Sequence, residues 1–385
     1  MLQLQYCYSW LESSAQGTVR PCYDSVVIVA SSMVSETGKK TDTLILSRGD
    51  VASLLRIPDC IDVVERAFVH HARGSANPPA VLGTHVEGGG FHVKTAGMIA
   101  SGLERPMFAA KINANFPGNP DRNGLPTIQG VLALFDAGSG RLLALLDSIE
   151  LTILRTAAAT AVAAKYLAPE AAVVAICGCG EQARSQLRAL ACVRRIERVT
   201  AIDANEKRAK SFAVDMASEL DVDISTATAP RDAPADTNVW VTCTTSHRWI
   251  LGREHVRPGS FIAAVGADNP EKQEIEPELL AANVVVADIL EQCATIGDLH
   301  HALDAGAMRR EDVRAELGDV VSGAKPGRTT AEEIIIFDST GTAIQDVAAA
   351  SIVYERALVS QAGSSIELGG AAVLAGTPVG DEGRA

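Results

Sequence analysis

The sequence lacks an excess of positive charge, and this absence limits the partners of the protein. Its 47 acidic and 34 basic residues give the 385-residue chain a formal net charge of −13. Nucleic-acid binding requires a basic face that neutralises phosphates, so no nucleic-acid partner is expected. An acidic balance of this kind fits a soluble protein, and we expect the chain to act in the cytoplasm.

Long apolar runs are missing from the first part of the chain. The longest apolar piece among residues 1–40 covers residues 26–30 and is far too short to span a membrane. The same segment has neither the charged start nor the small-residue cleavage pattern of a secretion signal. We therefore expect residues 1–43 to form an irregular N-terminal extension, and we expect no membrane contact.

A metal-binding pattern is also absent, although the sequence contains eight cysteines. Cys177 and Cys179 form a C-x-C pair, but no second pair of cysteines or histidines completes a zinc site. The pairs at residues 70–71 and 300–301 are histidines in stretches with a helical pattern, where surface or packing roles are expected. The cysteines are interpreted as reduced thiols, and no metal is predicted.

What the sequence does contain is a dinucleotide-binding fingerprint. A short apolar run is typical of a strand buried on both faces, and a G-x-G-x-x-A pattern follows it at Gly178, Gly180 and Ala183. The first glycine permits a tight turn, the second lets a pyrophosphate approach the backbone, and the alanine lets the next helix pack on the strand. This helix begins near Gln182, with Glu181 beside it, and its free N–H groups are expected to hold the phosphates.

The segments after the fingerprint predict the rest of a nucleotide-binding fold. Residues 198–203 form a second strand, and Asp203 at its end stands where a carboxylate hydrogen-bonds the ribose hydroxyls of the adenosine. Strand-like runs then alternate with crossover segments, which indicates an α/β fold with a Rossmann-type, doubly wound parallel sheet. These runs cover residues 221–226, 237–244, 261–266 and 283–288. The dinucleotide-binding domain is predicted over residues 166–324.

The remaining segments predict a smaller α+β domain formed by N- and C-terminal parts of the chain. Residues 44–165 combine helical and strand-like pieces with a loop rich in proline, glycine and asparagine, and residues 325–360 are expected to return to them. An alanine-rich helix over residues 150–168 joins the two domains and ends at Pro169. Residues 361–385 are rich in glycine and alanine, and we expect a disordered tail there.

Ligands of a doubly wound sheet bind beyond the carboxyl ends of its strands, and three predicted strand ends share one crevice. They are the glycine turn, the pair Thr244 and Thr245, and Gly266 with the two residues after it. Asp268 is the only acid at these ends, so it is a candidate general acid/base beside a nicotinamide. A helix cap or turn aspartate is an equally supported interpretation, because Pro270 follows closely.

Arg155 is the unusual residue of the alanine-rich helix. A guanidinium in an otherwise apolar stretch must be paired if it is buried. From the periodicity alone, a structural salt bridge and a carboxylate-binding role are supported equally.

Five motifs make the chain resemble the ornithine cyclodeaminase/mu-crystallin family over about residues 44–358. They are KINANFPGNPDRNGLPTIQG (111–130), LTILRTAAATAVAAKYLA (151–168), ICGCGEQA (176–183), VGADNPEKQEI (265–275) and FDSTGTAIQD (337–346). The resemblance implies a nicotinamide cofactor, an α-amino or α-imino acid substrate, and a homodimer built through the first domain. The family includes ornithine and lysine cyclodeaminases, alanine dehydrogenases and ketimine reductases.

The resemblance also assigns roles to single residues. Lys111 and Arg155 resemble the residues that grip the substrate carboxylate. Asp268 resembles the acid beside the substrate nitrogen, and Lys272 lies close to it in the same motif. The glycine turn and Asp203 match the cofactor site. Asp203 favours NAD, because a carboxylate repels the 2′-phosphate of NADP; NADP is kept as the alternative.

One position departs from the family pattern. Ala80 stands after a Pro-Pro pair where many members carry a basic residue that contacts the carboxylate. Lys94 in FHVKTAG is a candidate replacement, although a solvated strand lysine fits the sequence nearly as well. This departure weakens the strict cyclodeaminase and alanine dehydrogenase interpretations.

Together these observations predict an NAD(P)-dependent enzyme that reduces a small α-imino acid such as pyrroline-2-carboxylate, or that oxidises an amino acid in reverse. Hydride would pass between nicotinamide and the substrate Cα while Asp268 exchanges a proton with nitrogen. One alternative is ornithine cyclodeaminase, which forms proline and ammonia and recycles NAD. Another is a non-catalytic NAD(P)H-binding protein of the crystallin kind, against which the joint presence of Lys111, Arg155 and Asp268 argues.

Overall fold

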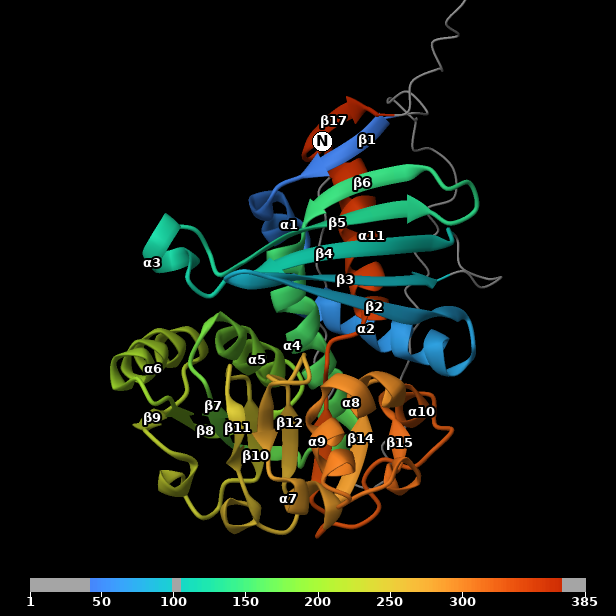
Figure 1. Ribbon diagram of the computed structural model, residues 1–385. Coiled ribbons are helices and arrows are strands. Elements are labelled where there is room, and N and C mark those ends of the chain that lie inside the picture. The colour runs from blue at the N-terminus through green and yellow to red at the C-terminus, as the bar shows by residue number, and fades with distance from the viewer. Residues whose placement is uncertain (1–41, 99–104, 369–385) are drawn as a thin grey trace, which may run out of the picture. The chain divides into compact units, whose positions relative to one another are not determined.

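The computed structural model describes residues 42–98 and 105–368, which form two main sheets (Figure 1). The first sheet has seven strands in the order β17-β1-β6-β5-β4-β3-β2. Their bounds are β1 (Asp42–Leu46), β2 (Ala76–Val86), β3 (Gly89–Met98), β4 (Met107–Asn115), β5 (Ile128–Asp136), β6 (Leu142–Asp147) and β17 (Ser364–Glu367). Strands β2 to β6 pair antiparallel with their neighbours, whereas β1 runs parallel to β6. The predicted α+β domain therefore has a mixed sheet.

Helices cover one face of the first sheet and leave the other face open. Side chains alternate between the two faces along each strand. In β5, Leu132 and Leu134 are fully buried on the covered face, whereas Val131, directly before Leu132, is 39% exposed on the other face. The covering helices are α1 (Arg48–Leu54), α2 (Ile57–Ala72), α4 (Ser148–Leu167) and α11 (Ala343–Ser360). A short helix, α3 (Asn119–Asn123), lies in the connection from β4 to β5. The buried side of this sheet is thus the side that can hold a site.

The second sheet has eight strands in the order β15-β14-β16-β12-β10-β7-β8-β9. Their bounds are β7 (Ala171–Cys177), β8 (Arg195–Ile202), β9 (Ile224–Ala227), β10 (Val239–Thr242), β12 (Phe261–Ala264), β14 (Val284–Ala287), β15 (Ala315–Glu316) and β16 (Ile335–Asp338). Every neighbouring pair is parallel. The order reverses between β7 and β10, which is the switch point of a doubly wound sheet. The predicted Rossmann-type α/β fold is confirmed.

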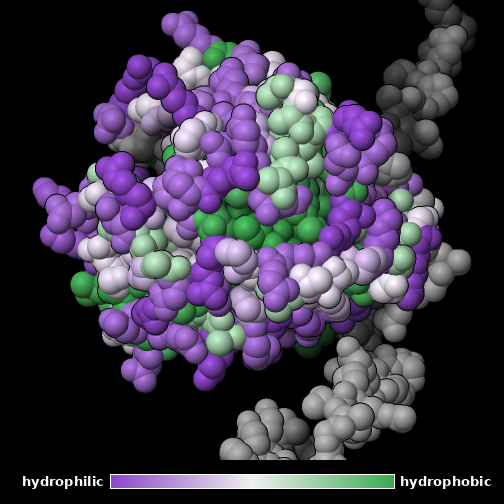
Figure 2. Space-filling view, turned by 90° about the horizontal axis from the view of Figure 1, so that it is seen from below, coloured by the Kyte–Doolittle hydropathy of each residue, from purple (hydrophilic) through white to green (hydrophobic). Residues whose placement is uncertain are grey.

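Short helices and a two-stranded sheet complete the nucleotide-binding half. The helices are α5 (Glu181–Ala191), α6 (Glu206–Leu220), α7 (Pro277–Ala281), α8 (Leu290–Ile296), α9 (Asp298–Asp304) and α10 (Leu317–Val321). The small sheet pairs β11 (His247–Leu251) with β13 (Gln273–Ile275). Figure 2 shows the face on which α7 lies in Figure 1; it is largely hydrophilic, with apolar residues gathered in a central hollow. Within residues 42–98 and 105–368, no helix combines the length and the apolar character needed to cross a bilayer.

Two of the predicted domain boundaries are wrong. Residues 325–360 were expected to belong wholly to the first domain, but β16 lies inside the nucleotide-binding sheet between β12 and β14. All four of its residues are buried, and a central parallel position is what such an apolar strand requires. The disordered tail predicted from residue 361 begins too early, because β17 pairs with the edge of β1 and satisfies its backbone there. The extension predicted over residues 1–43 lies outside the described residues as far as residue 41, and its last two residues already belong to β1. The tail beyond residue 368 also lies outside the described residues.

Candidate functional site

The glycine turn after β7 has the geometry that a phosphate-binding turn needs. Gly178 has a φ of +92°, and a Cβ atom there would lie 2.9 Å from the carbonyl oxygen of Cys243, so only glycine fits without strain. At Gly180, by contrast, an added Cβ would meet no described atom within 4 Å. Gly180 is also the N-cap of α5, and no side chain among the described residues caps this helix. The open space and the free N–H groups suit a pyrophosphate.

The other residues of the fingerprint support the turn in different ways. Ala183 is fully buried at the start of α5, a helix that packs mainly against α4. Glu181 begins α5 with an exposed side chain, whereas the Gln182 side chain donates to the carbonyl oxygen of Ile153 in α4 at 3.5 Å. Gln182 therefore links α5 to α4, and its backbone N–H belongs to the first turn of α5, whose N–H groups are predicted to hold the phosphates.

Asp203 lies at the end of β8, beside the glycine turn. Its carboxylate accepts hydrogen bonds from the backbone N–H of Cys179 at 3.0 Å and of Asn205 at 2.8 Å. The guanidinium of Arg208, in the first turn of α6, comes within 3.8 Å of the same carboxylate. Arg208 is five residues beyond Asp203 in the sequence, and the first turn of α6 brings its guanidinium back toward this carboxylate. Asp203 therefore shapes the turn as well as standing at the expected ribose position.

Glu274 joins the ends of two neighbouring strands, and the sequence analysis missed it. This fully buried carboxylate on β13 accepts the backbone N–H of Thr244 at 2.5 Å and of Gly266 at 2.8 Å. Burial raises the pKa of Glu274, and the hydrogen bonds oppose that shift. Thr245, which follows Thr244 in the sequence, is exposed. The carboxyl ends of β10 and β12 are thus held together at the predicted nicotinamide side of the sheet.

Two lysines lie opposite each other on the covered face of the first sheet. Lys94 of β3 and Lys111 of β4 are direct register partners, and both are buried. Like charges in this position repel, so each needs its own acceptors. Lys94 Nζ donates to the carbonyl oxygens of Thr340 at 3.0 Å and Gly341 at 2.8 Å. Lys94 is therefore a buried lysine and not the solvated strand lysine that was the alternative.

Asp346 of α11 is the shared partner of Lys111 and Arg155. Lys111 Nζ lies 2.7 Å from Asp346 Oδ2, and Arg155 Nε lies 2.9 Å from Asp346 Oδ1. Arg155 Nη1 also donates to Gln345 Oε1 at 2.9 Å. The structural salt bridge considered for Arg155 therefore exists. Asp346 was missed, although an acid in the mostly apolar stretch at the end of FDSTGTAIQD signals a buried counter-ion.

The charges of this cluster do not balance. Lys94, Lys111 and Arg155 are three buried cations, of which Lys111 and Arg155 share the carboxylate of Asp346, while Lys94 has carbonyl oxygens as its acceptors and the buried Asp288 as a more distant negative charge. Burial lowers the pKa of Lys111 to about 7, and the charge of Arg155 adds to this while Asp346 opposes it. Burial and Arg155 also lower the pKa of Lys94. A cluster with surplus buried positive charge has the chemistry that binds a small anion such as a carboxylate.

Asp268 follows β12 and carries the opposite charge. Its side chain is 53% exposed and forms an ion pair of 2.7 Å with Lys272, whose side chain is 14% exposed. Desolvation raises the pKa of Asp268, but the charges of Lys272 and Lys94 outweigh it and hold the pKa below its ordinary value. Asp268 is therefore a carboxylate at neutral pH, within electrostatic range of the lysine cluster.

His92 is a further candidate that the sequence analysis did not name. It stands two residues before Lys94 in β3, so both side chains lie on the covered face. Partial burial lowers the pKa of His92, the charge of Asp268 opposes this, and Lys94 reinforces it. The alternation in FHVK is the signal that could have identified it.

A Rossmann-type sheet whose strand ends stand near a buried cation cluster defines a two-domain, dinucleotide-binding class of protein. The chain belongs to the ornithine cyclodeaminase/mu-crystallin family, whose model matches residues 41–361. The resemblance drawn from the five motifs is confirmed. The roles of the single residues stay predictions.

Relatives of known activity cover most of the chain. An alanine dehydrogenase of Archaeoglobus fulgidus is 40% identical over 85% of this chain and 98% of its own length. A solved archaeal alanine dehydrogenase dimer with bound NAD has a TM-score of 0.80 and 39% identity, covering 85% of this chain and 99% of that one. The Δ1-pyrroline-2-carboxylate reductase of Thermococcus litoralis, in complex with NADH and L-proline, has a TM-score of 0.79 and 32% identity, covering 84% and 100%.

The two glycines of the turn should respond differently to substitution. Gly180→Val adds a side chain to open space, so the melting temperature should stay within about 2 °C while NADH binding weakens at least about a hundredfold, because the side chain fills the phosphate position. Gly178→Ala should lose both stability and binding, because of its positive φ. Differential scanning fluorimetry and NADH fluorescence titration measure the two effects. Tight NADH binding by Gly180→Val would place the phosphates elsewhere.

Proposed function

We propose that this protein is an NAD-dependent oxidoreductase that reduces a small α-imino acid, or oxidises the corresponding α-amino acid, in the cytoplasm. The observation that carries the proposal is the cluster of Lys94, Lys111 and Arg155 near the carboxyl ends of the nucleotide-binding strands, with the carboxylate of Asp268 in electrostatic range. Relatives with alanine dehydrogenase and pyrroline-2-carboxylate reductase activity support the same reaction class. The acidic sequence supports the compartment.

The cofactor-binding residues in this proposal are those around the strand ends. NAD, when bound, supplies or accepts the hydride at the substrate Cα. The N–H groups of the glycine turn would hold its phosphates and Asp203 its ribose, while the strand ends joined by Glu274 would face the nicotinamide. The proposed contacts are Gly178, Gly180, Glu181, Gln182, Ala183, Asp203, Thr244, Thr245 and Gly266.

The cation cluster would orient the substrate through its carboxylate. Arg155 uses Nε and Nη1 for Asp346 and Gln345, and among residues 42–98 and 105–368 its Nη2 meets no hydrogen-bond acceptor. A substrate carboxylate at Nη2 would also meet Lys94 or Lys111, since all three cations belong to one cluster. Binding would offset the surplus positive charge, and the fixed carboxylate would present Cα for hydride transfer.

Asp268 would act on the substrate nitrogen. As a carboxylate it can accept a hydrogen bond from the N–H of a protonated imine and stabilise the positive charge that makes Cα electrophilic. In the oxidation of an amino acid it can accept the ammonium proton. Lys272, paired with Asp268, would keep this carboxylate in place.

The first test is an assay of NADH oxidation at 340 nm with pyrroline-2-carboxylate, piperideine-2-carboxylate, and pyruvate plus ammonia. NADH consumption with one of them supports the proposal. L-Ornithine plus NAD is assayed for proline and ammonia in parallel. Proline without net change in NADH would replace the proposal with cyclodeaminase activity, and NADH binding without turnover of any substrate would favour the non-catalytic alternative.

Substrate affinity should fall as the pH rises through neutrality. The pKa of about 7 means that Lys111 loses its charge above this pH, and the carboxylate then loses one of its cations. We expect KM for the imino acid to rise about tenfold between pH 6.5 and pH 8.5. The variant Lys111→Arg keeps its charge and should give a nearly flat KM over this range. A wild-type KM that falls with pH would show that the unprotonated amine is the binding form.

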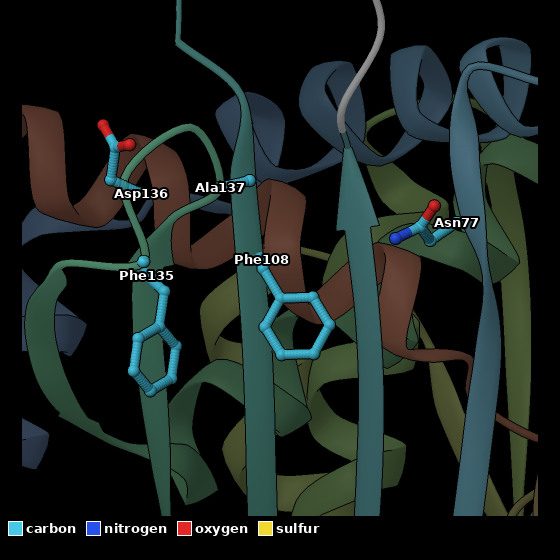
Figure 3. A pocket seen from close by; sticks show the side chains of 6 residues that line it. Asn77, Phe108, Phe135, Asp136 and Ala137 are labelled. Carbon is cyan, nitrogen blue, oxygen red and sulfur yellow. The ribbon is translucent and has the colours of Figure 1, made fainter.

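We also propose that the protein is a homodimer formed through the open face of the first sheet. Strand register places five apolar side chains on that face: Leu82, Phe91, Val93, Ile112 and Val131. Beside them, Phe108 and Phe135 of neighbouring strands point into a hollow of about 500 Å³ whose rim includes Asn77 and Asp136 (Figure 3). An apolar face of this extent is typical of a protein interface. The solved archaeal alanine dehydrogenase is a dimer.

Light scattering tests the dimer. The wild type should have twice the 40.3 kDa mass of the chain, and the double variant Leu82→Glu/Ile112→Glu should have half the wild-type mass. Val214→Glu is the matched control, because Val214 is 70% exposed on α6 of the nucleotide-binding half. A monomeric wild type would contradict the proposal, as would dissociation caused by the control.

A further inference from the structure

The turn between β16 and α11 provides the acceptors for Lys94. Both hydrogen bonds of the Lys94 amine go to carbonyl oxygens of this turn, at Thr340 and Gly341. Gly341 has a φ of +73°, and a Cβ there would lie 2.5 Å from Nη1 of Arg155. The turn therefore touches two of the three cations of the cluster, and its position decides where their nitrogen atoms lie.

Asp288 holds this turn from the nucleotide-binding sheet. It follows β14 directly and is fully buried. Its Oδ2 accepts the backbone N–H of Gly341 at 2.8 Å, and its Oδ1 accepts the hydroxyl of Thr340 at 3.0 Å. Gln292 of α8 adds a hydrogen bond of 2.7 Å to the same hydroxyl oxygen and one of 3.2 Å to the Gly341 carbonyl. Asp288 thus holds the peptide group between Thr340 and Gly341, whose carbonyl oxygen faces Lys94, and Gln292 holds the Gly341 carbonyl oxygen.

The direction of each peptide group makes the link specific. At Gly341, the N–H points to Asp288 while the carbonyl oxygen accepts from Lys94. Any rotation that breaks the first hydrogen bond displaces the residue that makes the second. The negative charge of Asp288 also acts on Lys94 and favours its protonated form. Asp288 thus reaches Lys94 by a hydrogen-bonded chain as well as by its charge.

We propose that Asp288 is a positioning residue for substrate binding: through the Thr340–Gly341 turn it places the Lys94 amine in the carboxylate-binding cluster. The effect of Asp288 on turnover rests on the proposed function. Its effect on the position of the Lys94 amine does not depend on that function. Asp288 stands in one sheet and Lys94 in the other, so the contact also ties the cofactor side of the site to its substrate side.

Replacing Asp288 with asparagine keeps the shape of the side chain but exchanges one hydrogen-bond acceptor, a carboxylate oxygen, for an NH₂ donor. Both carboxylate oxygens of Asp288 accept from donors, with Oδ1 also accepting the N–H of Ile289 at 2.7 Å. An amide has one oxygen and one NH₂ group, so one donor of the turn must face another donor. Because Oδ1 has more donors around it, the NH₂ group would face Gly341 N–H and push the turn away from Lys94.

The kinetic test compares Asp288→Asn with the wild type and with Lys94→Met. We expect KM for the imino acid to rise about tenfold in Asp288→Asn, with kcat and the NADH dissociation constant within about twofold of the wild type. The double variant Asp288→Asn/Lys94→Met should have the KM of Lys94→Met alone, since the two residues act through one contact. Additive effects on KM, or a loss confined to kcat, would overturn the proposal.

A second measurement follows the chemical reactivity of the Lys94 amine in the absence of any substrate. Lysine acetylation followed by mass spectrometry should label Lys94 about tenfold faster in Asp288→Asn, because the amine loses its acceptors and a negative charge that favours protonation. Lys111 on the next strand serves as the internal reference. Asp298→Asn is the matched control, since Asp298 is equally buried but bonds to Glu274 and Ile275 instead of the turn. Unchanged Lys94 labelling in Asp288→Asn would overturn the proposal even if every imino acid proved inactive.

Discussion

Replacing Asp268 with asparagine is expected to lower kcat by about 10²–10⁴-fold while the dissociation constant of NADH stays within about twofold. The amide has nearly the same size and keeps a hydrogen bond to the substrate nitrogen. It has no negative charge to stabilise a protonated imine, and it cannot accept the ammonium proton in the reverse direction. Asp268 follows β12 and is not among the proposed cofactor contacts, so the dissociation constant of NADH should stay close to the wild-type value.

Glu271→Gln is the matched control for this variant. Glu271 is an exposed carboxylate in the same loop, so the change removes the same charge without touching the ion pair of Asp268 and Lys272. The control should keep wild-type kcat, measured by NADH oxidation under saturating substrate. The lowered pKa of Asp268 also fixes the direction of its pH effect: the contribution of Asp268 to kcat should be lost only when the pH drops below the ordinary range of an aspartate. Turnover of Asp268→Asn at the wild-type rate would exclude the acid/base role.

The parts of the site that could be predicted from the sequence are those formed by residues that are close together in the chain. Gly178, Gly180 and Ala183 form one local turn, so their spacing alone indicates its function. The parallel sheet follows from the alternation of short apolar strands with crossovers, for the same local reason. Even so, the position of β16 was misjudged, because a four-residue apolar strand carries no signal for the sheet to which it belongs.

The parts that the sequence did not reveal depend on contacts between distant segments. Asp346, Asp288 and Glu274 each bind groups far away in the chain, on α4, on the turn before α11 and on two strand ends. Their common signal is an acid within a buried, apolar stretch, which requires a partner but does not identify it. For Arg155 the same ambiguity left two interpretations open: the structure shows the salt bridge to Asp346, and the carboxylate-binding role stays a proposal.

The second large effect is expected for Arg155→Met, in both stability and substrate binding. Removing one partner of a buried ion pair costs about 3–5 kcal/mol of unfolding free energy, and the lower end applies here because Asp346 keeps Lys111. The substrate carboxylate would lose a charge-assisted contact worth about 2–3 kcal/mol, so KM should rise about 30–150-fold. Urea unfolding and initial-rate kinetics measure the two quantities on the same preparations. Arg188→Met, which removes an arginine paired with Glu219 at the surface, should cost less than about 1 kcal/mol and leave KM unchanged.

The double variant Arg155→Met/Asp346→Asn separates the structural role of Arg155 from its binding role. In Arg155→Met, the buried carboxylate of Asp346 has lost one of its two cations. The change Asp346→Asn removes the negative charge of that carboxylate. Lys111 can then lose its proton instead of remaining an unpaired cation, because burial, the largest cause of its lowered pKa, is unchanged, while the losses of Arg155 and of Asp346 act on that pKa in opposite directions. Most of the lost stability should therefore return, whereas KM should stay high, since the guanidinium that binds the substrate is still missing. Recovery of KM together with stability would mean that Arg155 serves only to compensate Asp346, and the carboxylate would then have to bind through Lys94 and Lys111 alone.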